Sequence, residues 1–254
     1  MELASWRFTW FYAKNQIKLK YRYTSLGFLW NFLEPAMYLT VLSVVFSVVN
    51  EMNIRDYAVF LFSALVPWRY FEKIVNACTD SITGGEWLLK KMYVSPFVFP
   101  MIRWLVASVE FLFSLVVLFA IFAILKDNWT IHILILPLTI IPWSMLGLGM
   151  GMIAAVLFVF FRDIRTIVQM LLMIAFFSAP ILFKPVMFDT QSIQSTMLKW
   201  HPVTYFAALF QKPFYEASWP SALDWGVSMG FAGVSLLIGY ALVHRYKHKF
   251  YYYL

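Results

Sequence analysis

Charged residues and cysteines are scarce in this sequence of 254 residues. Asp, Glu, Lys and Arg together make up 13% of the chain, about half of the ~25% that soluble domains carry because their surface must be hydrated. The single Cys78 allows no internal disulfide, and the four His residues have no cysteine partners for a structural zinc site. By contrast, 62% of the residues are hydrophobic and 20% are aromatic. This composition excludes the soluble, disordered, collagen-like and disulfide-rich secreted classes and is typical of an integral membrane protein.

The sequence also lacks motifs that would supply chemistry of its own. It contains no G-x-x-x-x-G-K-[ST] phosphate loop and no H-E-x-x-H metal-binding helix. His244 and His248 are spaced i, i+4, but they lie in a basic segment and are interpreted as solvated side chains. We therefore expect no enzyme activity, no metal and no cofactor in this chain, so active transport would need an ion gradient or a separate ATPase.

Long apolar runs indicate helices that cross a membrane. The runs around 112–125 and 150–161 do not alternate as the strands of a β-barrel would. A spanning helix needs roughly 20 apolar residues because the hydrocarbon core is ~30 Å thick. We predict an all-α membrane protein in which residues 26–254 form a single domain of six transmembrane helices. The predicted spans are 28–50, 57–83, 104–125, 131–160, 166–183 and 224–243.

The distribution of Lys and Arg predicts the orientation of these spans. Segments 1–27, 84–103, 161–166 and 244–254 hold 13 of the 20 basic residues in 64 positions, whereas 51–56, 126–130 and 184–222 hold five in 50. Basic residues stay on the cytoplasmic side during insertion, so both termini are expected in the cytoplasm. The basic residues form four separate membrane-flanking clusters, which indicates contact with membrane lipids and argues against nucleic acid as a partner.

The first 25 residues are predicted to form an amphipathic helix at the membrane interface. They lack the continuous apolar core of a cleaved signal peptide. On a helical wheel an apolar stripe lies beside the basic Lys14, Lys18 and Arg22, which suits a helix at the headgroup level. A cytoplasmic tail with anchoring aromatic residues is the alternative. The apolar stripe comprises Leu3, Trp6, Trp10, Ala13 and Ile17.

The loop at 84–97 is predicted to contain a short helix on the cytoplasmic side. Gly84-Gly85 and Pro96 bound it, and Trp87 and Leu88 lie beside Lys90 and Lys91. A short helix with large apolar residues and cations suits the docking of a soluble partner. The alternative is a cationic patch that binds anionic lipid.

The segment 185–222 is too apolar for a flexible linker. Pro202 suits the start of a helix and Pro213 its end. We predict two short re-entrant helices on the periplasmic side, which either shape the outer mouth of a pathway or act as structural lids.

Ionisable residues inside the predicted spans need a partner, water or a function, because each costs ~2.5–3.5 kcal/mol at membrane depth. Arg69, Glu72 and Lys73 share a helix face through i, i+3 and i, i+4 spacing. We interpret this face as the polar wall of a water-filled path, with a self-satisfied ionic patch between helices as the alternative. Glu34 and Glu110 are expected either to pair with basic residues or to be protonated. The proposed wall also includes the rings of Trp68, Tyr70 and Phe71.

A series of short motifs resembles, in order and over nearly the whole chain, the membrane subunit of ABC polysaccharide exporters of the Wzm, KpsM and TagG type. The departures are His201, where the family usually has Asn, and the charged residues Arg69, Glu72 and Lys73. The motifs are Leu26-Gly27-Phe28-Leu29-Trp30 after basic residues and before Pro35, Leu65-Val66-Pro67-Trp68, Leu88-Leu89-Lys90-Lys91 with Pro96, Ile141-Pro142-Trp143, Gly147-Leu148-Gly149, Phe161-Arg162-Asp163-Ile164, Ala179-Pro180-Ile181 and Trp200-His201-Pro202.

This resemblance implies a homodimer of six-helix subunits in a bacterial inner membrane, with two copies of an ABC nucleotide-binding subunit that bind ATP and Mg. The expected substrate is an undecaprenyl-linked polysaccharide, with O-antigen (the Wzm type) or capsule preferred. Alternatives are a teichoic acid, lipid or drug exporter of the same fold and, more remotely, a membrane-embedded transferase or scaffold.

The resemblance also assigns roles to particular residues. Coupling to the ATPase is expected from Trp87, Leu88, Lys90, Lys91, Tyr93, Pro96, Arg162 and Asp163. The gate helix 1–25 and the substrate entrance would involve Arg22, Gly27, Trp30, Glu34 and Pro35. Trp68, Arg69, Tyr70, Phe71 and Glu72 would line the channel. The periplasmic gate 185–222 would include Trp200, His201 and Pro202.

Overall fold

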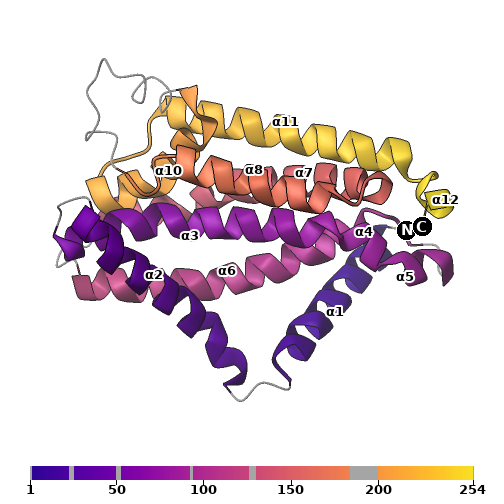
Figure 1. Ribbon diagram of the computed structural model, residues 1–254, viewed down its shortest axis with the longest axis horizontal. Helices are drawn as coiled ribbons and strands as arrows, with labels where there is room; N and C mark the ends of the chain where they lie inside the picture. Colours follow the sequence, from indigo (N-terminus) through magenta and orange to yellow (C-terminus); the bar gives the residue numbers. More distant parts are fainter. Residues whose placement is uncertain are drawn as a thin grey trace.

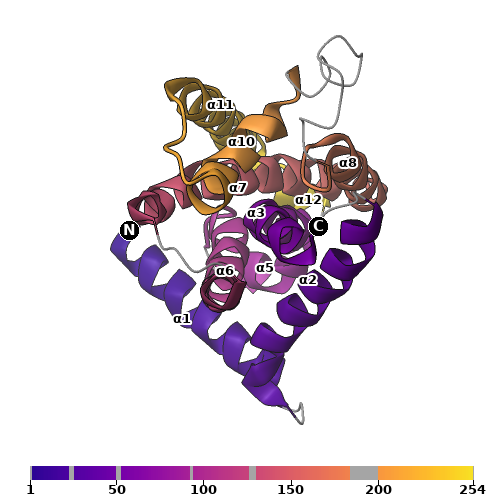
Figure 2. The same ribbon diagram turned by 90° about the vertical axis from the view of Figure 1, so that its left-hand side faces the viewer.

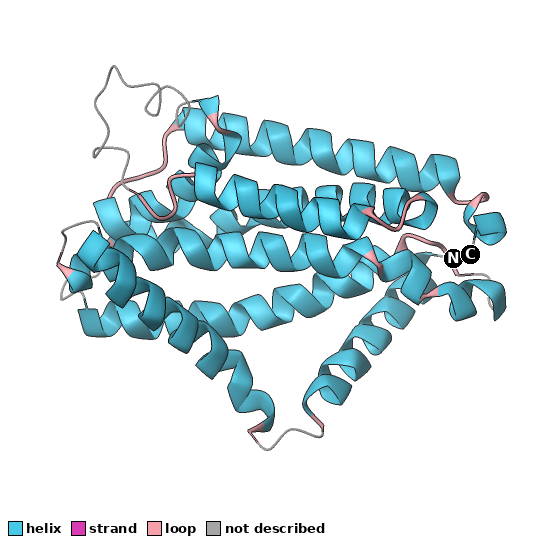
Figure 3. Ribbon diagram, viewed as in Figure 1, coloured by secondary structure: helices cyan, strands magenta, loops and turns pink. Residues whose placement is uncertain are grey.

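The computed structural model describes residues 2–22, 26–49, 53–91, 94–125, 130–183 and 200–253. These residues are helical and contain no β-strand, which confirms the predicted all-α class (Figure 3). In chain order the elements are α1 (Glu2–Tyr21), η1 (Gly27–Leu29), α2 (Trp30–Val49), α3 (Ile54–Thr79), α4 (Ser81–Gly84), α5 (Glu86–Lys91), α6 (Val98–Leu125), η2 (Ile131–Ile135), α7 (Leu136–Phe160), α8 (Ile164–Ser178), α10 (Pro202–Gln211), η4 (Lys212–Glu216), α11 (Ala222–Tyr246) and α12 (Phe250–Tyr253).

The long helices form a bundle with two distinct ends. Both chain termini lie at one end together with α5 and α12 (Figure 1), and we call this the termini end and the opposite one the far end. Helix α7 packs against α11 on one side and against α3 on the other, and α3 packs in turn against α6. This arrangement places α3 and α7 at the centre of the fold.

Glycines allow the close approach of α7 to its two neighbours. A Cβ atom added to Gly149 would lie 2.5 Å from the backbone nitrogen of Leu236 in α11. On the side facing α3, a Cβ added to Gly151 would lie 2.6 Å from the Cβ of Cys78. The sequence also suggests a small-residue contact at Gly226 and Gly230, but an added Cβ there meets nothing within 4 Å. Small residues therefore set the α7–α11 and α7–α3 contacts, as expected for helices packed in a membrane.

Within the described ranges, three helices are long and apolar enough to cross a membrane by length and composition, namely Val98–Leu125, Ile131–Phe160 and Ala222–Tyr246. Phe32–Val48 and Ile164–Ser178 are apolar but shorter. Helix α3 has 26 residues and a length of ~39 Å, but its charges lower its hydropathy. The structure thus contains a helix at each predicted span, and the count of six crossings stays a prediction.

Two helices have bounds that differ from those of the predicted membrane spans. Helix α6 begins at Val98 and not at residue 104, because Pro100 lies in the first turn, where the missing N–H leaves no hydrogen bond unmade. Helix α3 begins at Ile54, where the side chain of Asn53 accepts a hydrogen bond from Arg55 N. It ends at Thr79, and the last residues of the predicted span form the separate turn α4.

Helices α1 and α2 form a V against the bundle (Figures 1 and 2). Helix α1 packs on α6, and α2 packs on both α3 and α6. Thr9 and Ala13 are buried in the α1 contact, whereas Trp10 is 51% exposed. The predicted apolar stripe is thus divided, with Ala13 packed against the protein and Trp10 exposed. Its location at the membrane interface stays a prediction.

Helix α10 is folded into the bundle at the far end. Pro202 occupies its first turn as predicted, and Phe206 and Phe210 are buried. The Trp143 Nε1–H donates a hydrogen bond to the Phe206 carbonyl at 3.1 Å. The α-helix ends at Gln211, just before Pro213 as predicted, and the chain then continues as the π-helical turn Lys212–Glu216. The first of the two predicted short helices lies in 184–199, outside the described residues.

Candidate functional site

A charged recess of about 510 Å³ runs along one face of α3, between α2, α6 and α8. We call it the α3 recess. Its lining on α3 extends from Val66 to Asp80, which corresponds to ~21 Å of helix. Such a concentration of charge is unusual in a bundle with 13% charged residues, and each ionisable group at membrane depth needs a partner, water or a function. The charged lining residues are Glu34, Arg69, Glu72, Lys73, Asp80, Arg103, Glu110 and Arg165.

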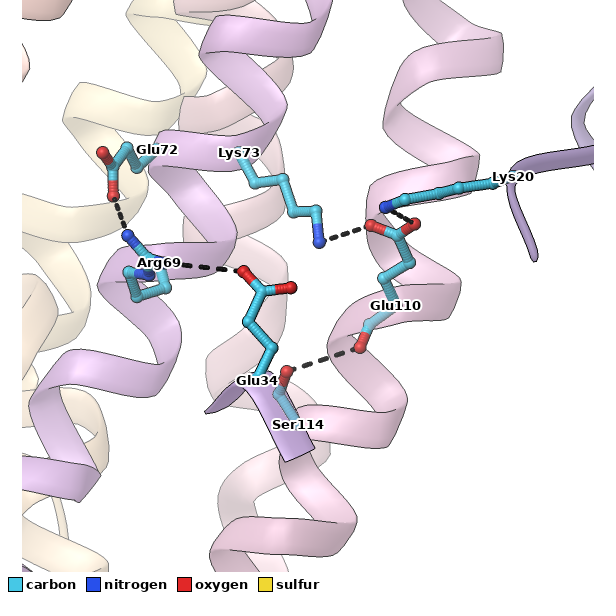
Figure 4. Close-up of polar contacts among 7 residues, drawn as sticks. All are labelled: Lys20, Glu34, Arg69, Glu72, Lys73, Glu110 and Ser114. Carbon is cyan, nitrogen blue, oxygen red and sulfur yellow. Dashed lines mark hydrogen bonds and ion pairs between the residues drawn. The ribbon is translucent and has the colours of Figure 1, made fainter. Parts of the chain in front are cut away.

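Arg69 joins α3 to α2 across this recess (Figure 4). Its guanidinium lies 3.5 Å from Glu72 Oε2 and 4.0 Å from Glu34 Oε1, and it stacks over the Tyr38 ring at 4.5 Å. All three charged side chains are partly exposed, so each pair contributes ~1 kcal/mol or less in water. These pairs are therefore not a large source of stability.

Glu110 is the centre of a second charged group, and its side chain is only 3% exposed. Lys20 Nζ of α1 lies 2.6 Å from Glu110 Oε1, and Lys73 of α3 pairs with Oε2 (Figure 4). The carboxylate thus bridges three helices, and of the two expected states for Glu110 the structure shows the paired one. Removing both lysines would leave the Glu110 charge buried without a cation, which costs ~3–5 kcal/mol.

The aromatic residues predicted to line the channel lie mainly on the opposite face of α3. The Trp68 ring packs in the core against Trp143 and Phe176, with centroids 6.5 and 5.8 Å away, and also contacts Phe71. The Tyr70 hydroxyl is 2.7 Å from the Ser108 hydroxyl, and the buried Tyr70 contributes to the recess wall. In this conformation Arg69 and Glu72 are therefore the exposed part of the predicted wall, whereas Trp68 and Phe71 are buried in the core on the other face of α3.

The recess also includes charged residues that were not predicted from the sequence. Asp80 lies seven positions after Lys73 on the same face of α3, and it pairs with Arg165 of α8 at 3.7 Å. Arg103 of α6 faces the same recess. The i, i+3, i+4 and i+7 pattern could have identified Asp80, but Arg103 and Arg165 are contributed by other helices and needed the fold.

The residues predicted to couple the chain to an ATPase gather at the termini end. On α5, Trp87 is exposed, Lys90 pairs with Glu86 at 2.6 Å, and Leu88 is buried. Arg162 and Asp163 are exposed at the α7–α8 turn. Leu88 thus anchors α5 while Trp87 remains available to a partner. Pro96 lies before α6, and Tyr93 is outside the described residues.

A separate hydrophobic cluster holds α5 in place. Leu88 and Leu89 pack with buried residues of α4, α6, α7, α11 and α12. Phe250 of the C-terminal turn is fully buried in this cluster, and the Phe160 ring contacts Tyr253 at 4.9 Å. The C-terminal segment therefore packs in the same hydrophobic cluster that holds α5 in place.

The residues predicted for the entrance lie around the tip of the V. Arg22 is exposed at the end of α1, and Gly27 adopts a positive φ of 47° that suits glycine. Trp30 and Glu34 are exposed, and Pro35 lies inside α2. Of this group, the structure brings only Glu34 and Pro35 to the α3 recess.

At the far end His201 joins two helices. Its Nδ1 accepts a hydrogen bond from Val203 N at 3.3 Å and so caps α10, while its Nε2 lies 3.1 Å from the Ser178 hydroxyl of α8. Burial lowers the pKa of His201, since it disfavours the charged ring. Trp200 beside it is exposed, and Pro202 starts α10.

The described residues do not assemble catalytic or metal-binding groups. Residues 226–230 match G-x-S-x-G, but they lie within α11 and not at the strand-to-helix turn that exposes a nucleophilic serine. No group of three or more His, Cys, Asp or Glu residues in the described ranges is placed to hold a metal ion.

An all-helical multi-pass membrane protein with a charged recess in its apolar bundle is the class that this fold and site define. No protein-family model matches the chain. It is 30% identical over 230 residues to the O-antigen export system permease protein RfbA of Myxococcus xanthus, covering 90% of this chain and 87% of that protein.

Other relatives are similar over the same extent. An O-antigen export system permease protein RfbA of Klebsiella pneumoniae is 23% identical over 243 residues, which is 94% of this chain and 91% of that protein. The polysialic acid transport protein KpsM of Escherichia coli is 27% identical over 237 residues, or 89% and 88%. The chain therefore belongs to the family of Wzm- and KpsM-type export permeases, which confirms the resemblance carried by the short motifs.

Proposed function

We propose that this chain is the permease subunit of an ATP-driven ABC exporter that moves a lipid-linked polysaccharide from the cytoplasm to the periplasm. The observation that carries the proposal is the charged α3 recess in an otherwise apolar bundle, combined with similarity to O-antigen and polysialic acid export proteins. A polymer with many hydroxyl groups needs a polar path through the membrane, with contacts weak enough to let it advance.

A homodimer completes the path in this proposal. On α8 only Leu172 is buried, and Ile167, Met170 and Ile174 are exposed. A second copy packed on the apolar faces of α8 and α2 would bring the two α3 recesses opposite each other across a two-fold axis. The polymer would then pass between two identical charged walls, at the dimer interface.

Energy would come from two copies of a nucleotide-binding subunit, which bind ATP and Mg and dock at the termini end. The exposed Trp87 and Lys91 and the α7–α8 turn at Arg162 and Asp163 form the docking surface in this proposal. Closure of the ATPases would move α5 and the hydrophobic cluster beneath it as a rigid body. Both termini are then cytoplasmic, in agreement with the distribution of Lys and Arg.

A deletion strain tests the function. Without the chain, lipid-linked glycan should accumulate inside the cell, and the plasmid-borne chain should restore surface glycan. The identity of the retained polymer separates O-antigen or capsule from teichoic acid, and retention of a lipid or drug alone would indicate an exporter of that compound. Normal surface glycan in the deletion strain would contradict polysaccharide export.

A further inference from the structure

The segment that follows α11 folds back onto the bundle. Residues 247–249 form a turn in which the Lys249 N–H donates a hydrogen bond to the Tyr246 carbonyl at 2.9 Å, and α12 then lies against α7. Phe250, the first residue of α12, is fully buried. A buried aromatic ring makes a large apolar contact, so α12 is held at the termini end of the bundle (Figure 1).

Three aromatic rings of this region contact Phe160, the last residue of α7. The centroid of the Phe160 ring lies 5.4 Å from that of Tyr246, 6.4 Å from that of Phe250 and 4.9 Å from that of Tyr253. The contacts with Tyr246 and Tyr253 are edge to face, which is a favourable geometry for aromatic pairs. We call these four residues the aromatic clasp.

The aromatic clasp lies directly beside the α7–α8 turn. Arg162 and Asp163 follow Phe160 within three positions and are exposed. The Phe161 N–H donates a hydrogen bond to the Leu157 carbonyl at 2.9 Å, so the helical hydrogen bonding of α7 continues up to the turn. The position of Phe160 therefore determines where Arg162 and Asp163 project into solvent.

The hydrophobic cluster behind the clasp also holds α5. Leu88 and Leu89 of α5 belong to one cluster with Phe250 and with Val156 and Val159 of α7. The proposed docking surface thus has two parts, α5 and the α7–α8 turn, that come from different regions of the chain. Their relative position depends on this shared cluster and on the clasp.

The clasp also connects the turn to the long helix α11. Tyr246 is the last residue of α11. A Cβ atom added to Gly239 of α11 would lie 2.6 Å from the carbonyl oxygen of Gly149 in α7, so the two backbones are in direct contact in mid-helix. A displacement of the α7–α8 turn would therefore move α7 and α11 together as a rigid body.

We infer that the aromatic clasp is a positioning device for the docking surface. It fixes the α7–α8 turn relative to α5, so that a nucleotide-binding subunit meets both parts in one arrangement. The inference rests on the proposed export function, in which such a subunit docks at the termini end. A surface that is ordered before binding loses less entropy when a rigid partner docks, and its affinity is higher for that reason.

The first experiment measures the mobility of the α7–α8 turn in the purified full chain, without ATPase. Cys78 is the single cysteine of the sequence, so a spin label on Asp163→Cys in a Cys78→Ala background reports on the turn alone by electron paramagnetic resonance. Tyr253→Ala should narrow the spectral lines of the label, because one ring of the clasp is lost. Tyr253 is 61% exposed, so its truncation opens no cavity in the core. Tyr253→Phe keeps the ring and should reproduce the parent spectrum.

Tyr240→Ala is the matched control. Tyr240 is 55% exposed, and its ring stacks on Phe97 with the centroids 4.8 Å apart. This variant removes an exposed tyrosine and one aromatic contact but leaves the rings on Phe160 in place, so the spectrum should stay as in the parent. Equal line narrowing in Tyr240→Ala and Tyr253→Ala would overturn the clasp. An unchanged spectrum in both Tyr253→Ala and Phe250→Ala would overturn it as well.

The second experiment measures the affinity of the full chain in lipid nanodiscs for the purified partner ATPase. Phe250→Ala should weaken binding about tenfold, because ordering one or two released side chains on binding costs about that factor. Should Phe250→Ala fail to fold, Tyr253→Ala gives the same test at an exposed position. A merely structural role would lower the melting temperature and leave the affinity of the folded protein unchanged. Parent-like affinity in a variant whose turn is mobile would therefore overturn the positioning role.

The two experiments separate failure of the clasp from failure of the export function. A parent chain that binds no ABC ATPase would remove the proposed export function and, with it, the role of the clasp in docking. A parent chain that binds the ATPase, with clasp variants that change neither the spectrum nor the affinity, would remove the clasp and leave the export function in place.

Discussion

The charged group around Glu110 leads to a prediction about non-additive stability. Lys20 and Lys73 are each about half exposed, and each can leave the other in place as a partner of the buried carboxylate. A single Lys20→Met or Lys73→Met substitution should therefore cost only ~0–1 kcal/mol. Replacing both lysines removes both cations and should cost ~3–5 kcal/mol, because the carboxylate stays buried.

A third substitution distinguishes a cost caused by the buried charge of Glu110 from a cost caused by lost side-chain contacts. Adding Glu110→Met to the double variant removes the buried charge and should recover much of the stability, although it removes a further polar group. At ~2–4 °C per kcal/mol for a domain of this size, the double variant should melt roughly 6–20 °C below the parent. Thermal unfolding of the purified chain in one detergent, at fixed protein concentration, measures all four variants.

The melting temperatures of the four variants together test whether the two lysines share the buried carboxylate. A double variant whose loss equals the sum of the single losses would refute the shared-carboxylate account. A triple variant less stable than the double one would also refute it, because the buried charge would then not be the source of the cost. Each single variant is the internal control for damage to helix packing.

Three further predictions concern packing, a titrating cap and docking. Gly149→Ala should lower the free energy of unfolding by ~1–3 kcal/mol, because the added Cβ would lie 2.5 Å from the backbone of α11. The control Gly230→Ala should be neutral or stabilising, since an added Cβ there meets nothing within 4 Å. Equal changes in thermal stability would contradict this packing. Because burial lowers the pKa of His201, the unfolded state binds more protons between the folded pKa and ~6.5. Stability should therefore fall as pH is lowered through this range, and His201→Asn, which still caps α10, should lessen that pH dependence; a slope identical to the parent's would contradict it. Trp87→Ala should weaken co-purification of the partner ATPase without lowering the melting temperature. The control is Trp219→Ala, which removes an exposed ring that contacts His132 edge to face, outside the predicted coupling set. Undiminished ATPase binding by Trp87→Ala would contradict docking at α5.

Composition and periodicity predicted the elements of the fold more closely than their boundaries. Apolar runs sufficed for α6, α7 and α11, because their hydropathy dominates any local signal. They did not indicate that α6 already begins at Val98, where Pro100 fits the first turn. Nor did they indicate the π-helical turn Lys212–Glu216 that follows α10.

The candidate site was predicted only in part, since spacing along one helix says which residues share a face but not what lies opposite. Arg69, Glu72 and Lys73 share the face expected from their i, i+3 and i, i+4 positions. That Trp68 faces inward follows from tertiary packing against Trp143. Arg103 became part of the site only because α6 lies beside α3.

The two faces of α3 have a consequence for how such exporters could diversify. Substitutions at Arg69, Glu72 or Asn76 alter the wall of the recess without touching the aromatic packing of Trp68 and Phe71. Charge and size along the recess can therefore change one residue at a time while the bundle keeps its shape. If the recess is part of the export path, as proposed, libraries restricted to this face should change which polymer is exported.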